Sequence, residues 1–311
     1  MHNMTSPAGA SSIRRPCGGE ASARRRSHAD SSGISPLPRP RPAGTGRALA
    51  GLVTPASDLG YLLRTRGWVL LDRVVPPGRC LALAEELRIA ADRCAAVRRA
   101  RGLDDVARGT AHHLVGEGRE LDMFLEDLPA MDLVADRLGA GFVLNSYGGV
   151  INRPGERAYV HAPHRDVRIF TRDVPLLVNM LVMLGDFTLD NGATMVLSGS
   201  HEVDEPPERA AFERWADRLV GKAGSVVVFD SCLWHAAGPN TSPRDRLALT
   251  LTFSRPFVKP QLDYLRKLGD ERVVALPPRT RTLLGYRARV PSTLDEWYRP
   301  RAERFYRPDA E

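Results

Sequence analysis

Four residues of this 311-residue chain have types and spacing that could do chemistry. His164 and Asp166 stand two positions apart, and His235 and Arg246 lie further along in a segment that reads WHAAGPNTSPRDR over positions 234–246. Residues two apart in an extended strand point to the same face, so His164 and Asp166 would project together. Two imidazoles and one carboxylate can hold Fe(II) on one face and leave the other positions open. This set therefore indicates a non-haem iron site.

The arginine in this set suggests a co-substrate. A guanidinium group can bind a carboxylate through two parallel hydrogen bonds. Arg246 follows His235 and leads the next predicted strand, where it could hold the carboxylate of a bound 2-oxo acid. Arg244 is the competing choice, and we expect it to be a solvated loop charge.

Each histidine also has a structural alternative. A His-x-Asp pair alone is weak evidence, because His164 could be a core or turn histidine bonded to a carboxylate. His201 closes the segment SGSH, where we expect a turn role. His161 stands three positions before His164 and would face the other way along a regular strand.

Composition narrows the class of protein. The net charge is +7, yet residues 1–50 hold eight arginines and only two acids, so the rest of the chain is close to neutral. We expect residues 1–48 to be a disordered basic tail rich in Pro, Ser and Arg, not a nucleic-acid-binding surface. The four cysteines form no CxxC pair, which favours a reducing, cytoplasmic setting. No apolar run is long enough to cross a membrane.

The hydrophobic pattern predicts one domain over residues 49–311, mainly β with flanking helices. Helices are expected over 79–101 and, interrupted at Pro129, over 121–138. Short strands broken by turns indicate a double-stranded β-helix (jelly roll, cupin-like); they are expected over 66–72, 142–147, 174–184, 194–197, 225–229 and 247–253. The parts would be a helical segment at about 76–138, a β core at about 142–254 and a C-terminal helix and loop segment at 255–311. Within the last, Ser292 is expected to cap a helix with Asp295 at its third position.

Three motifs together resemble the phytanoyl-CoA dioxygenase family of iron(II)/2-oxoglutarate-dependent oxygenases. They are HRD at 164–166, NGATMVLSGSH at 191–201 and WHAAGPNTSPRDR at 234–246, and the likeness runs from about Gly67 to Tyr286. The resemblance implies a double-stranded β-helix core and Fe(II) bound by His164, Asp166 and His235. It also implies that Arg246 binds the distal carboxylate of 2-oxoglutarate and that dioxygen is the second co-substrate.

The chain departs from the family pattern at two positions. Ala162 and Ala237 stand where many members carry polar residues. We therefore expect Thr194 and Asn179 to supply hydrogen bonds to the co-substrate, although Thr194 could be an ordinary strand residue. Asp166 occupies the position at which halogenating relatives carry a small residue, which argues against halogenation.

Residues that contact the substrate are harder to choose. We expect His113, beside His112, and Tyr147 to line the pocket, although a surface histidine and a core tyrosine are the common alternatives. The acidic loop from Glu202 to Arg218 could favour a cationic substrate, but a solvated face is the stronger interpretation.

The resulting functional hypothesis is an oxygenase of small molecules. We expect it to hydroxylate an unactivated C–H bond in specialised, natural-product metabolism, with succinate and carbon dioxide as co-products. Desaturation, epimerisation or ring closure could use the same iron site. Two further alternatives are a cupin-like metal enzyme that uses no 2-oxoglutarate, which leaves Arg246 without a role, and a non-catalytic ligand-binding jelly roll.

Overall fold

The computed structural model describes residues 56–103, 107–139 and 141–304, all within the unit Arg41–Glu311. Its larger sheet has six antiparallel strands in the order β1-β7-β4-β9-β3-β2. Their bounds are β1 Trp68–Leu71, β2 Thr110–Ala111, β3 Val143–Asn152, β4 Leu177–Met183, β7 Val226–Asp230 and β9 Arg246–Ser254. A smaller sheet has the order β6-β5-β8, with β5 Met195–Val196, β6 Asp217–Arg218 and β8 His235–Ala236. The predicted tail 1–48 lies outside the described residues.

The larger sheet is buried on both faces, because its central strands alternate between two apolar clusters. Val178, Met180 and Val182 of β4 pack into a cluster shared with the helices. Leu181 and Met183 of the same strand pack into a second cluster with residues of the smaller sheet. Successive side chains of a strand point to opposite faces, so the inner face of the larger sheet meets the smaller sheet.

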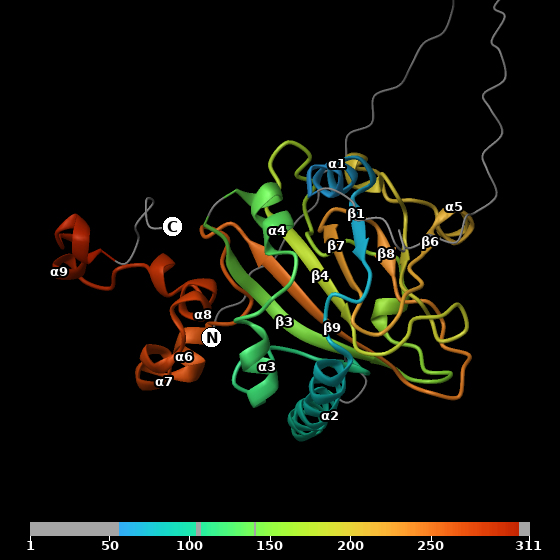
Figure 1. Cartoon of the computed structure of the whole chain (residues 1–311), viewed down its shortest axis with the longest axis horizontal. Helices are drawn as coiled ribbons and strands as arrows, with labels where there is room; N and C mark the ends of the chain where they lie inside the picture. The colour runs from blue at the N-terminus through green and yellow to red at the C-terminus, as the bar shows by residue number, and fades with distance from the viewer. Residues whose placement is uncertain (1–55, 104–106, 140, 305–311) are drawn as a thin grey trace, which may run out of the picture. The chain divides into compact units, whose positions relative to one another are not determined.

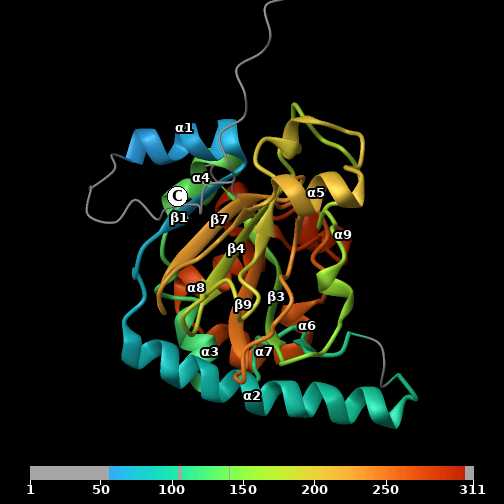
Figure 2. The same cartoon turned by 90° about the vertical axis from the view of Figure 1, so that its right-hand side faces the viewer.

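Helices cover the other face of the larger sheet. In Figure 1, α3 and α6 to α8 lie on the side of β3 away from the smaller sheet, and Figure 2 shows α1 and α2 at opposite ends of the strands. The helices are α1 Ala56–Arg66, α2 Pro77–Ala100, α3 Arg119–Phe124, α4 Met131–Leu138, α5 Arg209–Trp215, α6 Tyr264–Leu268, α7 Asp270–Ala275, α8 Pro278–Leu283 and α9 Leu294–Trp297. Short 3₁₀ turns are η1 Tyr159–His161, η2 Ser200–Glu202, η3 Tyr286–Ala288 and η4 Arg301–Glu303. No helix in the described ranges is both long and apolar enough to span a bilayer.

Helix α2 packs closely against the sheet because β3 carries two adjacent glycines. A Cβ at Gly149 would lie 2.3 Å from Cδ1 of Leu87 on α2. A Cβ at Gly148, on the other face, would lie 2.8 Å from the carbonyl oxygen of Ala111 in β2. Because neither glycine has a side chain, α2 can approach β3 closely at Gly149 and the backbone of β2 can approach β3 closely at Gly148.

The elements confirm the predicted arrangement of antiparallel sheets with helices. Helix α2 begins at Pro77, where a proline suits the first turn. Several details differ from prediction: α5 and β2 were not predicted, and β3 continues to Asn152, beyond its expected end at residue 147. Helix α1 was not predicted, and the C-terminal helix is capped one residue later than expected: the Thr293 hydroxyl accepts a hydrogen bond from the Glu296 amide. Ser292 instead binds the Glu296 carboxylate with its amide and hydroxyl.

Candidate metal centre

His164, Asp166 and His235 meet at one point. His164 and His235 form an isolated antiparallel bridge, in which each backbone amide donates to the other residue's carbonyl at 3.0 Å. Asp166 lies between the imidazoles, with Oδ1 3.7 Å from Nε2 of His164 and Oδ2 3.7 Å from Nε2 of His235. One ligand atom from each of the three lies within 4.8 Å of the others. This separation is compatible with a shared metal ion.

Both imidazoles are held in the orientation that a metal ligand needs. Nδ1 of His164 donates to the carbonyl oxygen of Ala162 at 2.8 Å, and Nδ1 of His235 donates to that of Leu233 at 3.0 Å. A carbonyl accepts only, so the proton sits on Nδ1 and the lone pair of Nε2 faces Asp166. The ring of Phe229 packs edge-on against His235, with 5.0 Å between the centroids.

The carboxylate of Asp166 is also oriented by the protein. Asn179, 3% exposed on β4, donates from Nδ2 to Oδ2 of Asp166 at 2.7 Å. Thr252 of β9 donates its hydroxyl to Oδ1 of Asn179 at 2.9 Å, which fixes the amide. The Asp166 amide donates to the carbonyl of Ser231 at 3.2 Å. Asn179, which was predicted to contact the co-substrate, lies with its amide against the Asp166 carboxylate.

Electrostatics keep His164 in the form that binds metals. Burial and the neighbouring His235 lower its pKa, against a smaller raising effect from Asp166. The imidazole is therefore neutral near pH 7, with a lone pair available for a cation.

Arg246 lies at the start of β9 with its guanidinium buried. The residue is 3% exposed, its charge lies 4.4 Å from the Phe187 ring centroid, and Nη1 is 3.5 Å from Oγ1 of Thr194. Its Nε has no hydrogen-bond partner, and no carboxylate in the described residues forms an ion pair with it. Burial lowers its pKa to about 10, which still leaves it charged at neutral pH. A buried, unpaired cation is costly, so this position fits a ligand carboxylate. Arg244, by contrast, is exposed.

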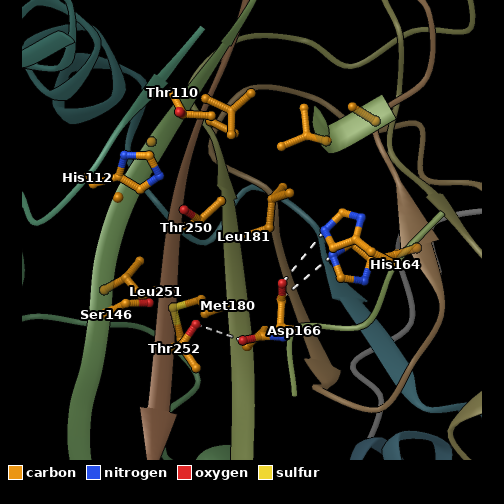
Figure 3. A pocket seen from close by; sticks show the side chains of 18 of the residues that line it. Thr110, His112, Ser146, His164, Asp166, Met180, Leu181, Thr250, Leu251 and Thr252 are labelled. Carbon is orange, nitrogen blue, oxygen red and sulfur yellow. Dashed lines mark hydrogen bonds and ion pairs between the residues drawn. The ribbon is translucent and has the colours of Figure 1, made fainter. Parts of the chain in front are cut away.

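The triad and Arg246 border one cavity of about 490 Å³. It lies against the inner face of the larger sheet. The residues of that sheet that line the cavity include Ser146 and Gly148 of β3 and Thr250 of β9. Figure 3 shows Asp166 directed at the imidazole pair, with His112, Ser146 and Thr250 across the cavity. Metal ligands, a candidate anion-binding residue and space for a further molecule therefore share one chamber.

Both predicted substrate contacts, His113 and Tyr147, belong to the lining of this cavity, and each side chain also has a hydrogen-bonding contact elsewhere in the protein. Tyr147 is fully buried, and its hydroxyl donates to the carbonyl of Leu121 at 3.3 Å, on the helix side of β3. His113 has a left-handed φ of 59°, and its Nδ1 lies 3.4 Å from the hydroxyl of Tyr264. His112 is the histidine that Figure 3 shows directed into the cavity. The interior hydroxyls of Ser146 and Thr250 were not predicted. The alternation of β9 carries that signal for Thr250, whereas the register shift in β3 hides it for Ser146.

The two other histidines in the described part of the chain, His161 and His201, have structural partners. His201 is buried, and its Nε2 lies 2.9 Å from the carbonyl oxygen of Arg64, as expected for a residue that closes a turn. His161 lies in η1, where Nδ1 accepts from the Ala158 amide at 2.9 Å and Nε2 lies 3.3 Å from Oδ1 of Asn152. Neither belongs to the metal-binding group found in the described chain.

Two curated relatives illustrate the likeness in sequence. The uncharacterised protein Rv1501 of Mycobacterium tuberculosis is 43% identical over 167 residues, which cover 54% of this chain and 60% of that protein. Dioxygenase af480 of Aspergillus fumigatus is 32% identical over 180 residues, which cover 53% of this chain and 56% of that protein. The chain thus spans at most 60% of the length of these two relatives.

Solved structures show the same fold at low sequence identity. The epimerase SnoN in complex with Fe³⁺, α-ketoglutarate and nogalamycin RO is 16% identical, with a TM-score of 0.53 over 69% of this chain and 91% of that chain. HygX from Streptomyces hygroscopicus, with nickel and 2-oxoglutarate bound, is 17% identical, with a TM-score of 0.53 over 65% and 88%. A family model described as phytanoyl-CoA dioxygenase matches residues 63–248. Since this match covers more than half of the sequence, the chain belongs to the phytanoyl-CoA dioxygenase family.

Proposed function

We propose that this protein is an iron(II)- and 2-oxoglutarate-dependent oxygenase of small molecules. The observation that carries the proposal is the pairing, in one cavity, of a His-Asp-His group with a buried guanidinium that has no carboxylate partner in the described part of the chain. A divalent metal fits the first and a dicarboxylate fits the second. Membership in the family and relatives named dioxygenases support the same conclusion.

The residues present fit both groups. Nε2 of His164, Nε2 of His235 and one oxygen of Asp166 would hold the iron, and the hydrogen bonds to Nδ1 and from Asn179 keep these atoms in place. Three protein ligands leave the other positions of an octahedral ion open. When bound, iron, 2-oxoglutarate and dioxygen would supply the oxidation: one oxygen atom of dioxygen would enter the succinate that forms as carbon dioxide is lost, and the other would go to the substrate.

Arg246 would bind the distal carboxylate of 2-oxoglutarate through paired charge-assisted hydrogen bonds. Its Nε, which has no hydrogen-bond partner among the described residues, would gain an acceptor, and Thr194 lies close enough to share the same carboxylate. Phe187 holds the guanidinium from one side, so the cation is oriented before the ligand arrives.

The same observations support a specific fold and a specific reaction. We propose that the two sheets are the halves of a double-stranded β-helix, because the catalytic-site strands of each face the shared cavity. We propose hydroxylation in natural-product metabolism as the outcome. Epimerisation is the second candidate, because the similar structure SnoN is an epimerase from nogalamycin biosynthesis. A cupin-like enzyme without 2-oxoglutarate, or a binding protein, would leave the Arg246 guanidinium buried without an anion.

The test is an anaerobic titration of metal-free protein. Fe(II) is added first and 2-oxoglutarate second while the visible spectrum is recorded. We expect a weak charge-transfer band that requires both additions, is lost in His164→Ala and is weakened in Arg246→Met. Folded protein that binds Fe(II) but develops no band with 2-oxoglutarate would refute the proposal and favour the cupin-like enzyme.

A further inference from the structure

The wall of the cavity opposite the metal centre offers a second binding surface. It is formed by Thr110, His112, Ser146 and Thr250, from β2, β3, β9 and the residue that follows β2. Figure 3 shows these side chains across the cavity from His164 and Asp166. We call these four residues the polar wall. A substrate that reaches iron held by the triad would lie between this wall and the iron. The hydrogen-bonding groups of the polar wall therefore restrict which chemical groups the substrate can carry.

His112 is the member of the polar wall with two available hydrogen-bonding atoms. Neither of its ring nitrogens has a hydrogen-bond partner in the described chain, and its nearest ring is that of His113 at 6.2 Å. The residue as a whole is exposed, but its ring borders the cavity, and desolvation there and the Arg98 guanidinium both lower its pKa. A neutral imidazole carries one donor and one acceptor, which matches a hydroxyl group.

The other members of the polar wall are uncharged hydroxyls. Thr110 is occupied, because its hydroxyl donates to the carbonyl of Ala107. Ser146 and Thr250 have no such hydrogen bond in the described residues, and both border the cavity. Three neutral groups that can donate and accept therefore face the same space, with no charge among them.

The charges around the cavity disfavour a cationic substrate. Asp166 is the one carboxylate among the described residues that line it, and that group belongs to the metal site. The remaining lining charges are cationic, and they include Arg168 and Arg246. None of the acids of the loop 202–218 lines the cavity: Glu202 pairs with Arg172 and Glu213 with its helix neighbour Arg209. An ammonium group would lose its hydration here without gaining a counter-ion.

We propose that the substrate is an uncharged molecule that presents a hydroxyl or carbonyl oxygen to His112, which thereby determines specificity. The proposal rests on the proposed function for the position of the iron. Arg168 is exposed and therefore solvated, so it does not call for an anionic substrate. Substrate held at the polar wall would place its other end toward the imidazole pair.

The experiment compares three compounds that share a scaffold: cyclohexanol, cyclohexylamine and cyclohexanecarboxylate, repeated on a decalin scaffold. Saturation-transfer NMR measures their affinity for protein loaded with Zn(II) and 2-oxoglutarate, and for metal-free protein. We expect the alcohol to bind most tightly. His112→Phe should weaken alcohol binding roughly three- to tenfold, the contribution of one hydrogen bond, and bring it to the level of the other two compounds.

His113→Phe is the matched comparison, because it makes the same replacement at the neighbouring lining residue, whose ring nitrogen contacts the Tyr264 hydroxyl and which is not part of the polar wall; the preference for the alcohol should persist. Preference for the amine or the carboxylate, equal binding of all three, binding of none, or loss of preference in His113→Phe instead would overturn the inference. Thermal shifts with Zn(II) and 2-oxoglutarate report separately on the metal centre and on folding. If 2-oxoglutarate gives no shift in the unaltered protein, the proposed function fails, whereas the alcohol preference is still read from the metal-free protein.

Discussion

Replacing Arg246 by methionine should make the ligand-free protein more stable while it abolishes 2-oxoglutarate binding. The pKa of this guanidinium is lowered from 12.5 to about 10 by burial. That difference corresponds to about 3 kcal/mol of free energy by which burial disfavours the charged form. The contact with the Phe187 ring, worth roughly 1–2 kcal/mol, offsets part of this cost. A net cost of about 1–2 kcal/mol is then borne by the protein without its ligand.

Methionine has a comparable length, no charge and a thioether that packs well against an aromatic ring. Arg246→Met should therefore raise the melting temperature of ligand-free protein by about 2–8 °C, at 2–4 °C per kcal/mol for a domain of this size. In the unaltered protein with Mn(II), 2-oxoglutarate at a hundred times its dissociation constant should add about 2.7 kcal/mol of stability. The variant should keep the stabilisation by Mn(II) and lose the increment from 2-oxoglutarate.

Differential scanning calorimetry with and without each ligand measures these quantities. Arg244→Met is the control, because that arginine lies two residues earlier and is exposed; it should change neither value. An Arg246→Met protein that melts lower than the unaltered protein and still gains the full increment from 2-oxoglutarate would refute the reasoning. It would show that the guanidinium is stabilised within the protein and does not bind the ligand.

Three further substitutions test the metal centre and one buried ion pair elsewhere in the fold. Asn179→Leu removes the amide that orients the Asp166 carboxylate, so Mn(II) affinity should fall about tenfold in calorimetric titrations; an unchanged affinity would contradict that role. Arg137→Met leaves the buried carboxylate of Asp230 without its ion pair at 2.7 Å, so urea unfolding should show a loss of about 3–5 kcal/mol, which an added Asp230→Asn change should partly restore. His164→Ala should remove the stabilisation by Mn(II) and leave ligand-free stability within about 1 kcal/mol; a full Mn(II) effect in this variant would exclude that residue as a ligand.

The sequence was sufficient to predict the elements that depend on local pattern. Alternation of apolar residues predicted the central strands, and proline and turn dipeptides separated them from the helices. The spacing of His164 and Asp166 placed two polar groups on one side of an extended segment. Such inferences succeed because side-chain direction over a few residues follows from backbone geometry alone.

Only the tertiary structure decided which neighbouring residues face the cavity. A register shift in β3 between Leu144 and Ser146 changes the phase of alternation, so that Ser146 lies on the inner face of the sheet and the Tyr147 side chain packs into the helix-side core, although both residues border the cavity. The left-handed φ of His113 similarly interrupts the alternation after β2. The contact between Asn179 and Asp166 joins a strand to a separate loop. These features arise from strand pairing and packing between distant segments, which a local pattern does not specify.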